Sequence, residues 1–258
     1  MNAGKYGTGK VGGRRMHWSE KIAKDIIKRS PDKEEYVCAA GISPSGSIHI
    51  GNFRDIATSY FVYKALIKQG KKARLLFSWD EFDRFRKVPV NDIGVDAVIV
   101  ADPSLIAICK EVAPELENEI GKPYVDVKDP YGCCSSYAEH FEKEFEASLS
   151  RFGVKVDFRR QSENYRSGKY AKYVIQAVQK RREIFDILDK FRQQVATPEE
   201  REAYYPVSIY CPVCGKDETT ITSSSEDGVT CEYTCKCGHK GTWDFSKDFN
   251  CKLAWKID

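Results

Sequence analysis

Several features that would place the chain in a familiar class are missing from its 258 residues. No apolar run approaches the roughly 20 residues that a membrane-spanning helix needs, and the basic, glycine-rich start lacks the apolar core of a secretory signal. A formal net charge of +3 does not by itself indicate a nucleic-acid-binding protein. We therefore expect a cytoplasmic protein with no membrane partner. We expect residues 1–15 to be a flexible basic arm, or alternatively a fusion remnant.

The two common glycine-rich phosphate motifs, the Walker pattern and G-x-G-x-x-G, are also missing. A different glycine-rich stretch, Gly41–Asn52, lies between the apolar run Tyr36–Ala40 and an amphipathic segment from Phe53 to Gln69. This order predicts a strand, a turn and a helix. The start of a helix suits a phosphate because its N–H groups are unpaired and its dipole end is positive. Taken alone, the pattern indicates only a nucleotide or another anion.

A second apolar run, Ala73–Trp79, completes a β-α-β unit whose strands we expect to be parallel. The glycine-rich stretch then lies at the carboxyl end of the first strand, where open α/β sheets bind their ligands. The charged segment Asp80–Lys87 follows the second strand and emerges at the same edge. A solvated strand end explains most of its charges, but a substrate amine would also find carboxylate partners there. The predicted fold is α/β with a parallel sheet.

The ten cysteines could indicate an oxidised secreted protein, but several of them occur at metal-binding spacings and no secretory signal precedes them. A Cys-x2-Cys pair followed by Gly, and a later Cys-x-Cys pair, together supply four thiolates, which suffice for a closed structural Zn²⁺ site. A redox pair at the first two cysteines is the alternative, but no thioredoxin-like context surrounds it. The predicted ligands are Cys211, Cys214, Cys235 and Cys237, with Cys231 and His239 in reserve.

The string Pro44–Asn52 reads Pro-Ser-Gly-Ser-Ile-His-Ile-Gly-Asn. It resembles the HIGH signature of class I aminoacyl-tRNA synthetases, in the form carried by the class I (archaeal-type) lysyl-tRNA synthetases. Further strings that resemble this family are Ser78–Pro89, Gln161–Tyr170 and Asn250–Asp258. The resemblance covers residues 16–258 except for a strand-turn-helix pattern near 92–114. That pattern looks like a βα unit of a collagenase-like peptidase barrel, and we expect it to be an insert of low functional weight.

The resemblance implies a Rossmann-like, HIGH-type nucleotidyl-transferase domain with a small zinc-ribbon insertion. It implies that ATP, with Mg²⁺, activates L-lysine to lysyl-adenylate, which is then transferred to tRNA(Lys). His49 and Asn52 would be catalytic, because they would stabilise charge on the phosphates. The implied ATP-binding residues are Pro44, Ser45, Gly46, His49, Gly51 and Asn52. The implied lysine-binding residues are Gly41, Ser43 and Trp255, although core packing is the alternative for the tryptophan.

A second zinc site is also implied by the resemblance. The family carries Asp-x3-Cys-His-x5-His, and this chain has a cysteine in place of the first histidine, which is still a competent zinc ligand. The alternative is an ordinary helix start with buried thiols. The implied ligands are Asp129, Cys133, Cys134 and His140.

Contact with the acceptor end of tRNA is implied for the region around Gln161–Tyr170. The contacts would be to phosphates rather than to base edges. The sequence predicts a long helix from Arg166 to about Gln194. The alternative to tRNA contact is a solvated basic face of this helix, with acidic partners one turn away. The residues concerned are Arg166, Lys169 and Lys172.

The second class I signature, KMSKS, and an anticodon-binding domain do not occur in these 258 residues. Since the lysine of that signature neutralises the departing pyrophosphate, we expect this chain alone to have impaired activity. A non-catalytic tRNA- or ligand-binding module derived from a synthetase is the alternative, and a nucleotidyl transferase for another amine-bearing substrate is a third. The expected organisation is an arm at 1–15, a catalytic domain at 16–205, a zinc-ribbon subdomain at 206–245 and a return to the catalytic domain at 246–258.

Overall fold

The computed structural model describes residues 16–86, 114–192 and 196–254. Its contacts divide the chain into two units. The first comprises residues 16–41, 49–78 and 149–159, and the second comprises the remaining described residues. Within the described ranges, no helix has both the length and the apolar character that crossing a membrane requires.

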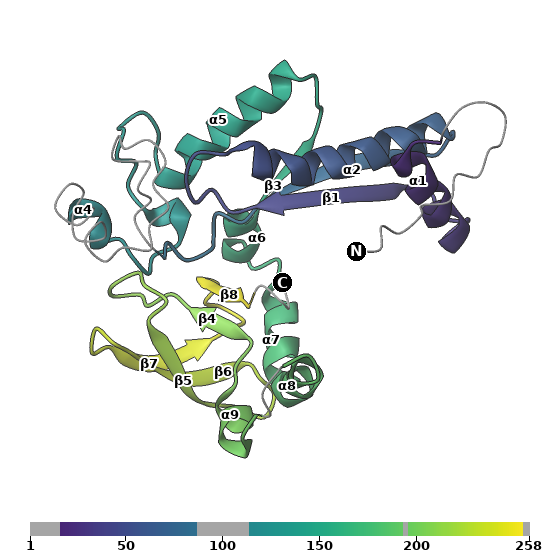
Figure 1. The fold of residues 1–258 in the computed structure, drawn as a ribbon. Helices are drawn as coiled ribbons and strands as arrows, with labels where there is room; N and C mark the ends of the chain where they lie inside the picture. The colour runs from purple at the N-terminus through teal and green to yellow at the C-terminus, as the bar shows by residue number, and fades with distance from the viewer. Residues whose placement is uncertain (1–15, 87–113, 193–195, 255–258) are drawn as a thin grey trace, which may run out of the picture. The chain divides into compact units, whose positions relative to one another are not determined.

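The first unit contains a parallel three-stranded sheet and two helices that pack against each other. Its elements are α1 (Trp18–Arg29), β1 (Tyr36–Ile42), α2 (Ile50–Lys68), β2 (Ala73–Trp79) and β3 (Asp157–Arg160). The strand order is β1-β2-β3, and α2 runs along β1 (Figure 1). Ala23, Tyr36 and Leu66 lie in its buried core. The predicted α/β fold with a parallel sheet is confirmed, and α2 begins earlier than the predicted start at Phe53.

The helices of the second unit differ from the expected pattern in one place. They are α4 (Pro114–Glu117), the 3₁₀ turn η2 (Tyr124–Asp126), most of α5 (Tyr137–Arg151), α6 (Gln161–Arg166), α7 (Ala171–Gln179), α8 (Arg181–Asp189) and α9 (Pro198–Ala203). A single helix from Arg166 to about Gln194 was predicted, and this is wrong. The chain turns at Gly168, whose φ of +74° favours glycine, and again at Lys180.

Two small antiparallel sheets complete the second unit. Strand β4 (Val207–Ile209) pairs with β8 (Cys251–Leu253). The other sheet has the order β5 (Thr219–Ser224), β6 (Thr230–Cys235) and β7 (Lys240–Asp244). The small β ribbon expected from the sequence is therefore present. The zinc assigned to it stays a prediction.

Some predictions fall outside the described residues. They concern the arm at 1–15, Trp255 and nearly all of the pattern near 92–114, of which only Pro114 is described, at the start of α4. The predicted domain boundaries also stay a prediction.

Candidate functional site

Helix α2 begins directly after His49, and two side chains close its first turn. The Nδ1 atom of His49 accepts a hydrogen bond from the backbone N–H of Gly51 at 3.0 Å. The Oδ1 atom of Asn52 accepts one from the backbone N–H of His49 at 3.4 Å. This reciprocal arrangement is a capping box with His49 as the N-cap. The two residues predicted to be catalytic therefore also stabilise the start of the helix.

These hydrogen bonds determine which atoms of the two side chains can still donate. Because Nδ1 of His49 accepts, the ring proton is on Nε2. Because Oδ1 of Asn52 accepts, its amide nitrogen keeps both N–H bonds. Neither donor has a hydrogen-bond partner in the part of the chain that the structure describes, and His49 is exposed. Both donors are therefore available beside the positive end of the α2 dipole.

The rest of the glycine-rich loop belongs to the second unit and is held at two points. The Ser43 hydroxyl donates to Asp83 Oδ2 at 2.7 Å, and the Tyr137 hydroxyl donates to the Ser45 carbonyl at 3.1 Å. Tyr137 is fully buried, so packing in the core fixes the hydroxyl group that holds the Ser45 carbonyl.

The other predicted ATP- and lysine-binding residues of the loop differ in exposure. Pro44 is buried, Gly46 is partly exposed and Gly41 is exposed at the end of β1. A Cβ atom added at Gly51 would lie 2.8 Å from Cε1 of His49, so only glycine leaves room for this ring position. The structure therefore explains why residue 51 is a glycine, which the motif alone does not explain.

Asp83 has a second partner that the sequence analysis did not single out. The ammonium group of Lys252, in β8, forms an ion pair with Asp83 Oδ1. Lys252 is only 6% exposed, which is unusual for a lysine. The available signal was its position between the apolar neighbours Cys251 and Leu253 in a strand, where a charge requires a partner.

A fully buried carboxylate, Glu81, follows β2. It accepts hydrogen bonds from the Gln161 N–H at 3.1 Å, the Ser162 N–H at 2.8 Å and the Ser162 hydroxyl at 2.6 Å. These bonds satisfy N–H groups at the start of α6. Burial raises the pKa of Glu81, and it also raises the pKa of Glu142, which pairs with Arg160, to about 7. Sequence reasoning did not identify this network.

The four cysteines predicted as structural zinc ligands lie together. Their sulfur atoms all fall within 4.8 Å of one another, with Cys211 and Cys237 at 3.8 Å and Cys214 and Cys235 at 3.7 Å. Burial raises the pKa of the Cys235 thiol to about 12, whereas the backbone N–H of His239 lowers that of Cys237. The donor set is the one that a tetrahedral Zn²⁺ site uses, and this group could hold a metal ion.

The second predicted ligand set also comes together. One ligand atom from each of Asp129, Cys133, Cys134 and His140 lies within 4.8 Å of the others. The sulfur of Cys133 is 3.1 Å from Nδ1 of His140, which in turn is 3.8 Å from Asp129 Oδ1. Backbone N–H groups of both cysteines donate to Asp129 at 2.8 Å, and Tyr131 stacks on His140. The backbone hydrogen bonds and the Tyr131 ring hold Asp129 and His140 in fixed orientations, which favours binding of a metal ion.

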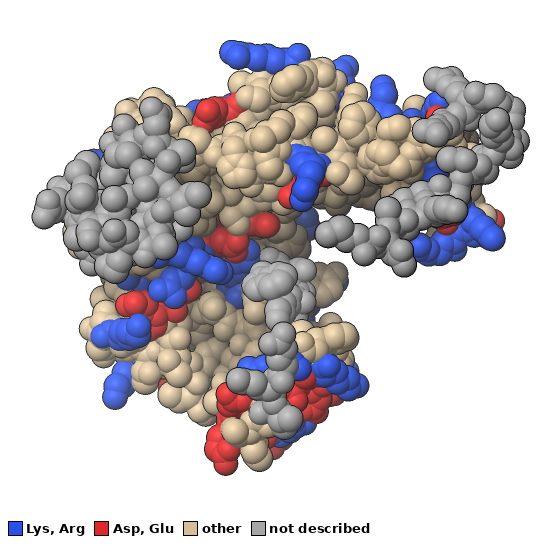
Figure 2. All heavy atoms as spheres, viewed as in Figure 1, with Lys and Arg blue, Asp and Glu red and all other residues tan. Residues whose placement is uncertain are grey.

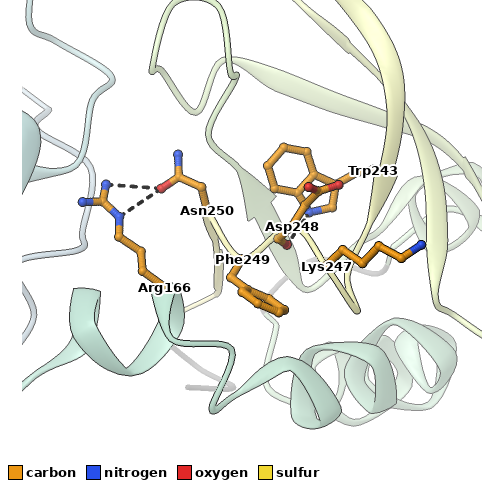
Figure 3. A pocket seen from close by; sticks show the side chains of 6 residues that line it. All are labelled: Arg166, Trp243, Lys247, Asp248, Phe249 and Asn250. Carbon is orange, nitrogen blue, oxygen red and sulfur yellow. Dashed lines mark hydrogen bonds between the residues drawn. The ribbon is translucent and has the colours of Figure 1, made fainter.

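Arg166, one of the predicted tRNA contacts, lines a cavity of about 490 Å³ (Figure 3). Its guanidinium donates to Asn250 Oδ1 at 3.3 and 3.2 Å, and it also pairs with Asp126. Lys247, on the far side of the cavity, pairs with Asp244 at 2.8 Å. The charges of both cations are therefore already balanced by carboxylates.

The other two predicted tRNA contacts are exposed. The ammonium of Lys169 donates to Asn164 at 3.0 Å, and that of Lys172 lies 4.7 Å from the centre of the Tyr173 ring. Positive and negative side chains are intermixed over α8 and α9 (Figure 2), where for example Arg182 donates to Glu202 at 2.6 Å. The basic side chains of α8 thus have acidic partners, as we would expect if this helix presents a solvated face.

Comparison with known proteins gives the context for these groups. Residues 16–258 match the family model described as tRNA synthetases class I (K). The chain belongs to this family. The match runs through residues 92–114, the segment that we expect to be an insert.

Individual relatives agree with the family assignment. The chain is 41% identical over 243 residues to the lysine–tRNA ligase of Thermococcus kodakarensis, covering 94% of this chain and 42% of that protein. It is 36% identical to the lysine–tRNA ligase of Treponema pallidum, with 94% and 42% covered, and 35% identical to that of Methanococcus maripaludis, with 94% and 41% covered. The resemblance to class I lysyl-tRNA synthetases is thereby confirmed. The chain spans about two fifths of the length of these relatives.

Proposed function

We propose that this chain binds L-lysine and ATP and directs the formation of lysyl-adenylate, the first half of the lysine–tRNA ligase reaction. The observation that carries the proposal is the start of α2. There, Nε2 of His49 and the amide nitrogen of Asn52 are available as donors beside the helix N-terminus. Membership of the class I (K) family and relatives named lysine–tRNA ligase support it.

In this reaction a carboxylate oxygen of lysine attacks the α-phosphorus of ATP. A new oxygen–phosphorus bond forms, the bond from the α-phosphorus to the bridging oxygen of the β-phosphate breaks, and pyrophosphate leaves with that electron pair. Negative charge on the phosphate oxygens is stabilised by N–H donors from His49 and Asn52 and by the α2 dipole. Because these donors are already oriented by the capping box, little reorganisation is needed when the phosphates bind. Mg²⁺ would enter with ATP and offset the charge of its phosphates.

The four ribbon cysteines would hold a structural Zn²⁺, as their donor set and mutual distances fit. The metal would tie the turn after β4 to the end of β6, and no catalytic step passes through it. The second set, around Asp129 and His140, would hold another zinc, with Cys134 as a thiolate ligand.

Transfer of the lysyl group to tRNA(Lys) completes the proposed function at the level of the family. In this chain, contact with tRNA phosphates is proposed for Arg166, Lys169 and Lys172, of which the two lysines have no carboxylate partner in the described part of the chain. A cytoplasmic location accords with a role in protein synthesis.

Calorimetric titration and pyrophosphate exchange test this proposal together. We expect the chain to bind lysine and ATP and to show lysine-dependent exchange between ATP and labelled pyrophosphate, slower than in full-length relatives because the KMSKS lysine is missing from these residues. A panel of amino acids separates lysine from other amine-bearing substrates. If the chain bound tRNA but neither small ligand, it would instead be a binding module.

A further inference from the structure

Three side chains of the second unit form a relay that ends at the glycine-rich loop. Lys252 pairs with Oδ1 of Asp83, and Oδ2 of Asp83 accepts the Ser43 hydroxyl at 2.7 Å. The Lys252 side chain is 7% exposed and that of Asp83 is 28% exposed. The ammonium group is therefore interior, while the carboxylate and the serine reach the surface.

Backbone hydrogen bonds fix the position of Asp83, the central residue of the relay. The Asp83 N–H donates to the Asp80 carbonyl at 3.1 Å, and the Asp83 carbonyl accepts the Tyr124 N–H at 2.9 Å. Asp83 thus sits in a closed turn after β2. Its carboxylate reaches both partners from a defined position.

The chemistry of these groups sets the direction of the Ser43 hydroxyl. An ammonium group only donates, so Asp83 must accept from Lys252, and the ion pair stabilises negative charge on the carboxylate. An ionised carboxylate only accepts, so the single O–H proton of Ser43 is committed to Asp83. Toward a ligand, Ser43 Oγ can therefore act only as a hydrogen-bond acceptor.

We propose that Asp83 and Lys252 are positioning residues for Ser43, whose contact with the substrate lysine the family resemblance already implies, and that they orient its Oγ as an acceptor for an ammonium group. The proposal rests on the proposed function, because lysine supplies two ammonium groups, each of which can only donate. Lys252 holds the carboxylate through a partly buried ion pair, and loss of the carboxylate would leave the interior ammonium group without this partner. A ligand with an apolar or acceptor group at this position finds no donor from Ser43.

The isosteric Asp83→Asn variant tests the polarity of the relay. Its amide can donate to Ser43 Oγ and occupy the lone pairs that the substrate would use. We expect the lysine affinity to fall by roughly ten- to a hundredfold, as for hydrogen bonds to charged groups, with unchanged ATP affinity. Adding Ser43→Ala should cause no further loss. Unchanged lysine affinity in Asp83→Asn, or independent losses in the double variant, would overturn the proposal.

Lys252 is tested with Lys252→Met and Lys252→Arg, and Lys236→Met, at an exposed lysine of the ribbon, is the matched control. We expect weaker lysine binding in Lys252→Met, recovery in Lys252→Arg and no change in the control. Tighter lysine binding in Lys252→Met would show that Lys252 repels the substrate and does not position the relay.

Two lysine analogues identify the ammonium group concerned. Norleucine lacks the side-chain ammonium, and 6-aminohexanoate lacks the α-ammonium. If Ser43 meets the α-ammonium, Asp83→Asn weakens norleucine binding and leaves 6-aminohexanoate unchanged, and the reverse holds for the side-chain ammonium. If neither analogue were affected although both bind, the relay would not contact an ammonium group.

A measurement without ligand separates this inference from the proposed function. Hydrogen exchange of the backbone amides of Ser43 and Ser45 should be faster in Lys252→Met and Asp83→Asn than in the wild type and in Lys236→Met. If the wild type binds no lysine, the proposed function fails, and the exchange data still decide whether the relay holds the loop. Equal exchange in all four proteins would overturn the positioning role.

Discussion

The Nδ1 atom of His49 accepts a hydrogen bond from the backbone N–H of Gly51 at 3.0 Å, and Cε1 of the ring lies 2.8 Å from the position that a Cβ atom of residue 51 would take. The same contact that caps α2 leaves the ring proton on Nε2, which remains available as a donor. One side chain therefore combines a structural and a proposed catalytic role. Substitutions can separate the two.

We expect His49→Ala to lose both roles and His49→Asn to lose only one. Asparagine is a good N-cap, whereas alanine is not, so His49→Ala should lower the free energy of unfolding by about 1 kcal/mol and His49→Asn should not. Both variants lack the imidazole donor, so pyrophosphate exchange should fall on the order of a hundredfold in each. Urea unfolding and the exchange assay provide the two readouts. An active His49→Asn variant would exclude the imidazole from catalysis.

The cysteine quartet predicts a ribbon that depends on zinc. Cys214→Ser should lose one equivalent of zinc and lower the melting temperature, because a structural zinc contributes to folding. A strong chelator should do the same to the wild type, and rebinding should release protons from thiols such as Cys235, whose pKa is about 12 without metal. Metal analysis and thermal unfolding measure these effects.

Cys231 supplies the control for the quartet. It was a reserve ligand in the sequence analysis, but it lies outside the group of four in the structure. Cys231→Ala should therefore keep its zinc. Loss of zinc in this variant would mean that the ligand set is wrong.

The cluster around Asp129 leads to a separate zinc prediction. Cys133→Ala should remove one equivalent of zinc and leave the ribbon zinc in place, since the two ligand sets share no residue. Cys134→His, which restores the family pattern, should keep the metal because both side chains are zinc ligands. If Cys133→Ala and the wild type hold the same amount of zinc, this cluster is an ordinary helix start.

The sequence predicted the parts of the molecule that depend on local pattern. Strand β2 and the strand at Tyr36 follow from apolar runs, and the cysteine spacing identified four side chains that do meet. The sequence did not predict features that depend on contacts between residues far apart along the chain. At the break at Gly168, the ring of Phe249 packs so closely that a Cβ atom would lie 2.8 Å from it, and the relay joins Ser43 to Asp83 and to a buried lysine in β8. Such pairings cannot be read from spacing.

Glu81 predicts how stability depends on pH. Burial raises its pKa above the usual value of 4.5, so the folded state holds this proton more tightly than the unfolded chain does. The wild type should therefore lose stability relative to Glu81→Gln as the pH rises above 4.5, until the raised pKa is passed and the difference becomes constant. Urea unfolding of both proteins across this range measures the difference.

The matched control for Glu81 is a carboxylate with the opposite shift. The hydrogen bond from Arg201 lowers the pKa of Asp186 below its usual 3.8, so its stabilising contribution is lost only as the pH falls through that lowered value. Above pH 4.5 the stability difference between the wild type and Asp186→Asn should be constant. The stability difference between the wild type and Glu81→Gln could instead stay constant, or the wild type could gain stability as the pH rises. Either result would mean that ionisation of Glu81 does not destabilise the folded protein. Its three hydrogen bonds at the start of α6 would then outweigh its burial.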